Sequence, residues 1–213
     1  KAGAKLLAIT ALPDPSDGVA PEMNAEKRKK AEAILADVRK AAEPAGVAIE
    51  TGVRYGHDPY EVIVKEAKDT AADVVVMGRR GRRGLARVML GDATAKVMGY
   101  APCSVLVVPE TAVMWGPVLI ATDGSRSSDE ACVAAARIAH CCDSPLDVVS
   151  VMVPSHNEAR QAEARQIVDR VVAALKKDAI AVEGFVERGI AEEVILDLAK
   201  RRRTGLIVLG SHG

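Results

Sequence analysis

Glycines and arginines crowd together after a predicted buried strand at residues 72–78. The stretch "VVVMGRRGRRGLARVMLG", residues 74–91, holds four glycines (Gly78, Gly81, Gly84, Gly91) and five arginines (Arg79, Arg80, Arg82, Arg83, Arg87). A strand that runs into glycines before a helix is a common arrangement for binding phosphate. Glycine lets backbone N–H groups approach an anion, and the helix N-terminus adds donors and positive potential. Guanidinium groups beside such a loop could neutralise a triphosphate.

The spacing of these glycines matches neither GxGxxG nor GxxxxGK[ST]. Taken alone, the loop therefore indicates phosphate binding only weakly. A solvated arginine face, or a surface that pairs with acidic groups, is an equally open interpretation.

An internal repeat organises the chain. Residues 61–81, "EVIVKEAKDTAADVVVMGRRG", align without a gap on residues 193–213, "EVILDLAKRRRTGLIVLGSHG", with eight of twenty-one positions identical. Upstream, "LLAITAL" at 6–12 corresponds to "LDVVSVM" at 146–152. Two copies of one unit are therefore expected.

Each copy alternates short β-branched runs with helical patterns. We expect strands at 5–12, 47–54, 72–78, 103–108, 117–123, 146–153, 180–187 and 205–210. We expect helices at 22–43, 58–70, 91–100, 127–141, 157–177 and 190–202. Near-continuous Val, Ile and Leu strands between helices are typical of a parallel sheet covered on both faces, so the predicted class is α/β and doubly wound.

The two copies lack different parts. Residues 1–112 form a first repeat without a counterpart of "PVLIATDGS" and its helix, and residues 113–213 form a second repeat without a last helix and strand. Each is short by roughly 30 residues of a βα unit. We interpret the chain as a fragment of a longer tandem, or as one completed by another chain.

Three motifs carry a family resemblance over essentially the whole chain. Gly78, Gly81 and Gly91 are separated by two and nine residues, and are followed by a helix and "APCSVLVVP", with Ser104 where a proline is usual. "TDGS" at 122–125 and "LGSHG" at 209–213 supply the strand end and loop start in the second repeat. This combination resembles the universal stress protein family. The resemblance implies two tandem Rossmann-like, five-stranded sheets of order 3-2-1-4-5.

The resemblance also implies an adenine nucleotide site, with ATP or ADP as the ligand and Mg²⁺ as an accompanying ion. Asp123 would hold adenine and ribose, Ala11 or Val151 would contact adenine, and the loop backbone would surround ribose and phosphates. In the first repeat the implied residues are Ala11, Met77, Gly78, Arg79, Arg80, Gly81, Gly91, Asp92 and Ala93. In the second they are Asp123, Val151, Leu209, Gly210, Ser211, His212 and Gly213. Independently, a crevice where strand order reverses is the expected ligand site of such sheets.

One position departs from the family pattern. ATP-binding members usually have Ser or Thr after the last glycine, and this chain has Asp92. A carboxylate repels phosphates and offers no proton at neutral pH. We interpret Asp92 chiefly as a helix N-cap, a favoured use of Asp. Asp58 before Pro59 likewise fits a helix start.

Composition excludes several classes. Twenty-nine basic residues balance twenty-nine acidic ones and aromatics are 2%, so we expect neither nucleic acid nor membrane partners. Four cysteines without metal spacing are interpreted as reduced and mostly buried, which favours the cytoplasm. The cations at 201–203 end a helix, where they suit its dipole.

We therefore expect a cytoplasmic, homodimeric nucleotide-binding sensor or adaptor in the stress response. A non-nucleotide interaction module of the same fold is the alternative. An enzyme is the weakest hypothesis, because no catalytic constellation stands out.

Overall fold

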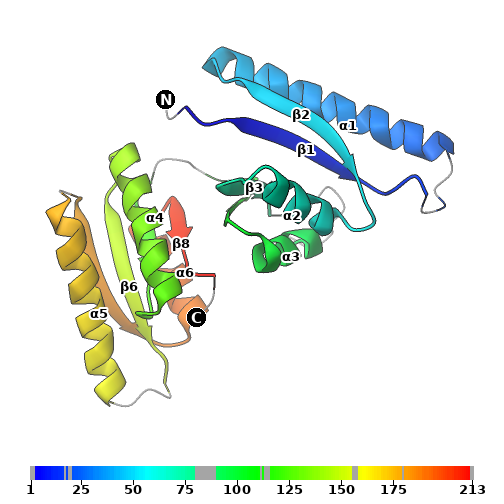
Figure 1. Cartoon of the computed structure of the whole chain (residues 1–213). Coiled ribbons are helices and arrows are strands. Elements are labelled where there is room, and N and C mark those ends of the chain that lie inside the picture. Colours follow the sequence, from blue (N-terminus) through cyan, green and yellow to red (C-terminus); the bar gives the residue numbers. More distant parts are fainter. Residues whose placement is uncertain are drawn as a thin grey trace. The chain divides into compact units, whose positions relative to one another are not determined.

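The computed structural model describes residues 3–16, 18, 21–79, 90–110, 112, 116–154, 158–178 and 180–211. The chain divides into two compact units, Lys1–Glu110 and Thr111–Gly213. Figure 1 shows the elements of each unit.

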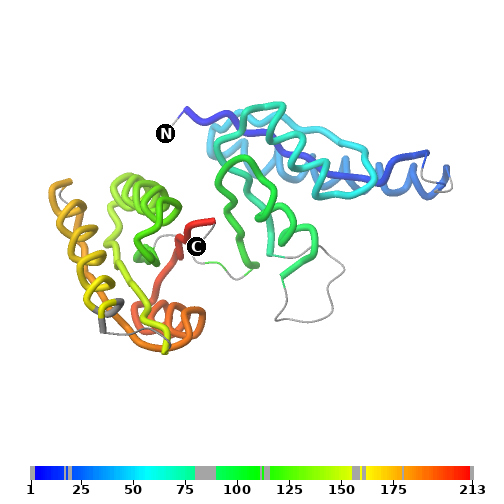
Figure 2. The backbone as a smooth tube through the Cα atoms, turned by 60° about the horizontal axis from the view of Figure 1, so that its bottom comes forward, coloured from blue at the N-terminus to red at the C-terminus, as the bar shows by residue number. Residues whose placement is uncertain are grey.

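The first unit contains two pairs of parallel strands. Its elements are β1 (Leu6–Leu12), α1 (Pro21–Ala42), the 3₁₀ turn η1 (Glu43–Ala45), β2 (Ile49–Tyr55), α2 (Pro59–Asp69), β3 (Val74–Gly78), α3 (Asp92–Tyr100) and β4 (Ser104–Val108). Strand β1 pairs with β2, and β3 pairs with β4. Helix α1 lies along β1 and β2 (Figures 1 and 2), while α2 packs against β1 and α3.

The second unit has one continuous sheet. Its elements are β5 (Val118–Ala121), α4 (Arg126–Cys142), β6 (Leu146–Met152), α5 (Glu158–Lys177), β7 (Val182–Arg188), α6 (Ala191–Arg202) and β8 (Leu206–Val208). All strands are parallel, in the order β7-β6-β5-β8. Helices α4 and α5 pack on β6 (Figure 1), and α6 also contacts it.

The predicted class and every predicted strand and helix are confirmed, with ends within about two residues. The order 3-2-1-4-5 is not observed as such. Numbered within the repeat, the second unit gives 3-2-1-4. In the first unit, β1, β2, β3 and β4 correspond to the second, third, fourth and fifth strands. Within the described residues no strand lies between β1 and β3, so its sheet is split into two ribbons.

Core packing differs between the units because only the second has a central strand among the described residues. In the second unit, α4 and α5 cover one sheet face, burying Val118, Ile120, Leu146, Val148 and Val168, whereas α6 covers Leu119 and Val149 on the other. Among its described residues the first unit buries fewer apolar side chains, namely Ala31, Leu35, Val64, Ala67 and Val97. The central strand and its helix therefore organise most of the core in this fold.

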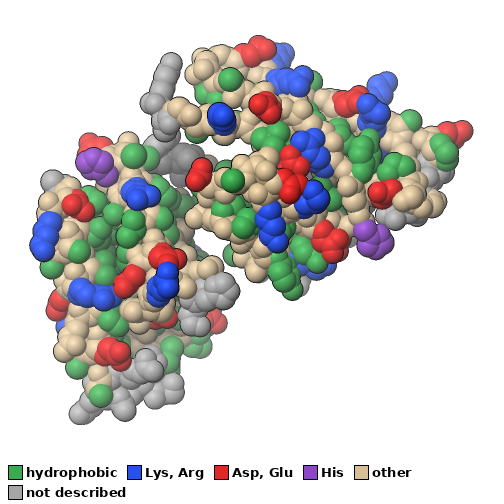
Figure 3. All heavy atoms as spheres, viewed as in Figure 1, with side chains coloured by type: hydrophobic (Ala, Val, Ile, Leu, Met, Phe, Trp, Pro, Cys, Tyr) green, Lys and Arg blue, Asp and Glu red, His purple; other side chains and the backbone are tan. Residues whose placement is uncertain are grey.

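The expectations for the charged residues and for the cysteines can be compared with the structure. On the face shown in Figure 3, basic and acidic side chains are interspersed among the described residues, in keeping with the zero net charge. All four cysteines are free, but only Cys132 is buried, and Cys141 is exposed. The expectation that most cysteines are buried is therefore wrong. None of the helices in the described part of the chain combines the length and the apolar character that spanning a bilayer requires.

Candidate functional site

The topology of the second unit fixes where a ligand crevice is expected. Strand β5 lies between β6 and β8, and the chain leaves β5 through α4 towards β6. The carboxyl ends of β5 and β8 therefore point to the place where strand order reverses. Ligands of open α/β sheets bind there. The segments at these two ends are residues 122–125 and 209–211.

The loop after β5 is fixed by its own hydrogen bonds. Thr122 is buried, and its hydroxyl lies 3.0 Å from that of Ser128 and accepts from the Gly124 N–H at 3.2 Å. The Ser125 N–H donates to Asp123 Oδ1 at 2.9 Å. Gly124 has a φ of +79°, a conformation in which glycine is unstrained. The short polar side chains of "TDGSRSS" thus set the loop shape.

Asp123 is the charged group that this loop presents. Its side chain is exposed at the strand end. Burial alone would raise the pKa of Asp123, but hydrogen bonds from Ser125 and Ser128 outweigh burial and lower it below the ordinary value. The carboxylate is therefore ionised at neutral pH and can accept hydrogen bonds from hydroxyl groups.

Helix α4 begins directly after this loop. Ser125 is its N-cap, with a side chain that accepts from the Ser128 N–H at 3.2 Å. The Ser128 hydroxyl donates back to the Ser125 carbonyl at 2.9 Å. The first N–H groups of a helix have no intrahelical partner and carry the positive end of the dipole. Anions are stabilised at such a position.

The loop after β8 runs against the same helix end. A Cβ placed on Gly210 would lie 3.0 Å from the Ser127 carbonyl carbon and 3.0 Å from the Ser128 nitrogen. These neighbours are backbone atoms, which cannot rotate away. Only glycine allows this approach without displacement. The structure therefore brings together Asp123, the α4 N-terminus and Gly210, from segments more than eighty residues apart in sequence.

The remaining predicted residues of the second unit flank this place. Val151, near the end of β6, is partly buried and packs against the cluster of Leu119, Val149 and Leu198. Leu209 is 57% exposed, and Ser211 follows it at the surface. His212 and Gly213 lie outside the described residues.

The predicted loop of the first unit is already engaged with the protein. The Arg79 N–H donates to the Val108 carbonyl at 3.2 Å, and the Gly91 N–H donates to the Arg79 carbonyl at 2.9 Å. Buried Thr94 donates its hydroxyl to the Gly78 carbonyl at 3.1 Å. Arg80 and Gly81 lie outside the described residues. The amides of Arg79 and Gly91, on either side of the loop, are thus used internally.

The first unit also lacks other parts of the arrangement among its described residues. Ala11, near the end of β1, and Met77, in β3, lie on strands with no described strand between them. The first unit therefore offers no described counterpart of Asp123 or of the α4 N-terminus. The second unit is the better candidate.

Asp92 does not have the predicted capping role. Gly91 occupies the N-cap position of α3, and Asp92 and Ala93 begin the helix, so the N-cap interpretation is wrong by one residue. The Asp92 carboxylate instead pairs with Lys96 at 3.0 Å, and this hydrogen bond is the main cause that raises the pKa of Lys96. Asp58 is confirmed as the N-cap of α2, with Pro59 first in the helix.

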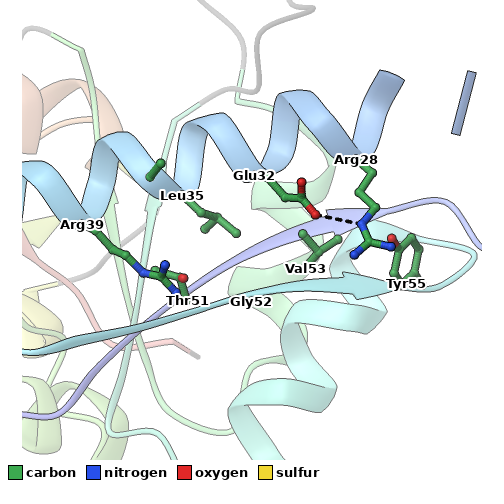
Figure 4. Close-up of a pocket in the computed structure, with 9 residues that line it drawn as sticks. Arg28, Glu32, Leu35, Arg39, Thr51, Gly52, Val53 and Tyr55 are labelled. Atoms are coloured by element: carbon green, nitrogen blue, oxygen red, sulfur yellow. Dashed lines mark hydrogen bonds and ion pairs between the residues drawn. The ribbon is translucent and has the colours of Figure 1, made fainter. Parts of the chain in front are cut away.

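A shallow pocket of about 380 Å³ lies between α1 and β2, lined by Arg28, Glu32, Arg39 and Tyr55 among others (Figure 4). Arg28 donates to Glu32 at 2.8 Å, so a neighbouring carboxylate offsets its charge. None of the predicted site residues lines this pocket. Of the two arginines in this pocket, Arg28 is thus already paired.

Sequence reasoning missed the hydrogen-bonded pair of Thr122 and Ser128 and the close approach at Gly210. The signal for the first was the run of Ser and Thr before a helix. The second depends on two loops that meet only in the folded sheet. Among the described residues there is no group of three His, Cys, Asp or Glu side chains placed to hold a metal.

Comparison with known proteins places these features in a family. The model of the Universal stress protein family matches residues 1–109 and again 114–213. Universal stress protein Sll1388 of Synechocystis sp. is 40% identical over 83 residues, which are 39% of this chain and 53% of that protein. Universal stress protein MJ0531 of Methanocaldococcus jannaschii is 40% identical over 81 residues, which are 38% of this chain and 47% of that protein. The match thus spans about half the length of these curated relatives.

A solved structure is similar over nearly the whole chain. The crystal structure of a universal stress protein from Archaeoglobus fulgidus has a TM-score of 0.76, with 21% identity, and the match covers 95% of this chain and 74% of that one. At this identity the likeness concerns the fold.

Proposed function

The chain belongs to the universal stress protein family, with one match in each half, and on this premise we propose that its second unit binds an adenine nucleotide. One observation carries the proposal. Gly210 allows the loop after β8 to contact the α4 N-terminus beside the ionised Asp123. ATP or ADP is the proposed ligand, with Mg²⁺ as an accompanying ion.

Each group at the ends of β5, β6 and β8 suits one part of a nucleotide. The Asp123 carboxylate accepts hydrogen bonds from ribose hydroxyls, and partly buried Val151 offers an apolar contact for adenine. The backbone of residues 209–211 and the α4 N-terminus bind the phosphates. Family resemblance assigns these roles, and the contacts around Gly210 support them.

We propose a binding protein rather than an enzyme, acting as a stress-response sensor or adaptor. Binding of the nucleotide is its proposed role, and no step of turnover is assigned to any residue. Homodimer formation and a cytoplasmic location belong to the same proposal and depend on the family resemblance.

The alternative is an interaction module without a nucleotide. Engagement of Arg79 N–H and Gly91 N–H inside the protein favours this role for the first unit. Asp92→Ser tests the first unit directly, because it restores the hydroxyl residue that is usual in ATP-binding members. A second equivalent of bound nucleotide in this variant would show that Asp92 had closed the first site.

Isothermal titration calorimetry of the whole chain with ATP, ADP and AMP tests the proposal. We expect one equivalent of ATP or ADP to bind. Asp123→Ala removes a charged hydrogen-bond acceptor, for which about 1.5–3 kcal/mol, or about tenfold or more in affinity, is expected.

Gly210→Ala should weaken binding by a similar factor, because its methyl group forces the loop away from α4. Gly99→Ala is the matched control, since a Cβ there meets nothing within 4 Å. Absence of binding to the unaltered chain would refute the proposal, as would equal binding by the Gly210 and Gly99 variants.

A further inference from the structure

The pocket between α1 and β2 in the first unit holds an arginine that the protein itself does not use. Arg39 reaches from α1 toward Thr51 on β2 (Figure 4), and no carboxylate among the described residues pairs with it. Arg28, at the Tyr55 end of the pocket, is already paired with Glu32. We propose that this pocket binds a small organic carboxylate with a short apolar body, and that Arg39 and Thr51 hold the carboxylate.

The equivalent place in the second unit is filled by apolar side chains. The second half of α1 and the whole of β2 align without a gap on α5 and β7. Val172 then takes the place of Arg39, and Gly184 that of Thr51. A Cβ on Gly184 would lie 2.5 Å from Val168 and 2.9 Å from Val172, so these valines close the joint between helix and strand. In the first unit a guanidinium and a hydroxyl stand at the same two positions.

The place of the pocket in the sheet is the same in both units. All its lining residues come from α1 and β2. Strand β2 pairs with β1 alone, and its equivalent β7 is the end strand in the order β7-β6-β5-β8. The pocket therefore depends on the packing of one helix on one end strand. The second unit has that packing too, so the difference between the units at this place lies in the side chains.

The charges that line the pocket fit a monoanion. Arg28 donates to Glu32 at 2.8 Å, so these two charges offset each other and that of Arg39 is left over. A guanidinium binds a carboxylate through two parallel hydrogen bonds. A phosphate dianion would bring a second negative charge close to Glu32, which would repel it. The pocket therefore favours a carboxylate over a phosphate.

The surface between the charged groups is apolar. Val53 lies between Thr51 and Tyr55 on the same face of β2, and buried Leu35 of α1 lines the pocket with them. Ligand pockets typically combine an apolar lining with a few polar groups that fix the orientation of the ligand. The volume of about 380 Å³ is near the lower end of the range of about 300–1,000 Å³ for such pockets, so a small ligand is expected.

Phenylacetate is the probe, because it joins one carboxylate to a short apolar body. It is titrated into the isotope-labelled whole chain, and binding is followed by the amide chemical shifts in NMR spectra. We expect saturable shifts at the amides of Arg39, Thr51 and Val53, with a dissociation constant of about 1–5 mM. Phenylacetamide has nearly the same shape without the charge, and it should bind about fivefold or more weakly.

Arg39→Gln should weaken phenylacetate binding about fivefold or more, because a charged donor is lost from a partly exposed pocket. Lys40→Gln is the matched control. It removes the same charge from the next residue of α1, which does not line the pocket, and should leave binding unchanged. Both side chains are exposed, so both variants should keep the fold. Glu32→Gln frees Arg28 and should tighten binding about twofold or more.

The proposal is overturned if phenylacetate causes no saturable shifts at concentrations about tenfold above the expected dissociation constant, or if the shifts lie in the second unit. Equal binding of phenylacetate and phenylacetamide would overturn it, as would tighter binding of inorganic phosphate than of phenylacetate. So would equal binding by the Arg39 and Lys40 variants, or weaker binding by Glu32→Gln. The test does not involve the nucleotide site proposed for the second unit.

Discussion

Replacing Arg202 by alanine should destabilise the second unit by about 2–3 kcal/mol. Arg202 donates from Nε to Asp147 Oδ2 at 2.9 Å and from Nη2 to Oδ1 at 3.0 Å, while Nη2 also reaches Glu183 at 2.7 Å. Its guanidinium lies 5.1 Å from the Phe185 ring centroid. The Asp147 side chain is only 3% exposed, whereas that of Arg202 is 38% exposed.

The expected loss of stability follows from this difference in exposure between Asp147 and Arg202. Removing one partner of a fully buried pair costs about 3–5 kcal/mol, because the other charge stays buried and unpaired. Here water can enter from the exposed Arg202 side, so part of that cost is screened. Asp147→Leu combined with Arg202→Ala should recover most of the loss, since the equivalent of Asp147 in the first unit is Leu7.

Urea denaturation followed by circular dichroism, with hydrogen exchange at the Leu146 and Val148 amides, measures the effect on this unit. Arg201→Ala is the control, because Arg201 pairs with Glu187 and Asp197 at the surface and should contribute less than about 1 kcal/mol. The reasoning fails if Arg202→Ala costs no more than Arg201→Ala, or if the double variant is no more stable than Arg202→Ala.

Three further predictions concern single groups. Hydrogen bonds from Arg54 lower the pKa of the Glu66 carboxyl in the folded protein. The Arg54–Glu66 pair therefore stabilises the fold above the unfolded-state pKa of Glu66, and this stabilisation is lost as pH falls through the folded-state pKa. Arg54→Ala should make the free energy of unfolding depend less on pH in that acidic range. Burial raises the pKa of Cys132 to about 11, so at pH 8 a thiol reagent should modify exposed Cys141 far faster. Ser125→Ala removes the α4 cap and should cost about 1 kcal/mol in chemical denaturation.

Each of these has an outcome that contradicts it. An unchanged acid limb in Arg54→Ala would show that the ion pair contributes nothing to stability. Equal labelling rates at Cys132 and Cys141, read by peptide mass spectrometry, would mean that Cys132 is accessible. If Ser125→Ala is as stable as the unaltered chain, the Ser125 cap does not stabilise α4.

Much of the local structure was predictable from the sequence. The 3.6-residue stripe of α1 and the β-branched runs of β1 and β6 gave elements with nearly correct ends, because these periods reflect burial on one face. Asp58 and Pro59 gave a helix start for the same local reason. Asp92 was misplaced by one residue because Gly91, with extended backbone, takes the N-cap position and no side chain marks the boundary.

The arginines at residues 201–203 have a contact that local sequence patterns could not predict. Their placement at a helix end suggested only an interaction with the dipole. The structure shows that Arg202 also neutralises a carboxylate buried on β6, 55 residues away. Charge pairs between distant elements leave no periodic signal, so composition and spacing could not have found this one.

The amino-acid sequence determined that this protein has two α/β units of one family, because hydrophobic period and internal repetition are properties of short segments. The tertiary structure alone decided in which unit the predicted site residues come together. Asp123, the α4 N-terminus and Gly210 meet only because β5 and β8 pair side by side, and that pairing is a long-range contact. In the first unit the same kinds of segment are present without a central strand among the described residues, so neither strand order nor a complete site follows from them.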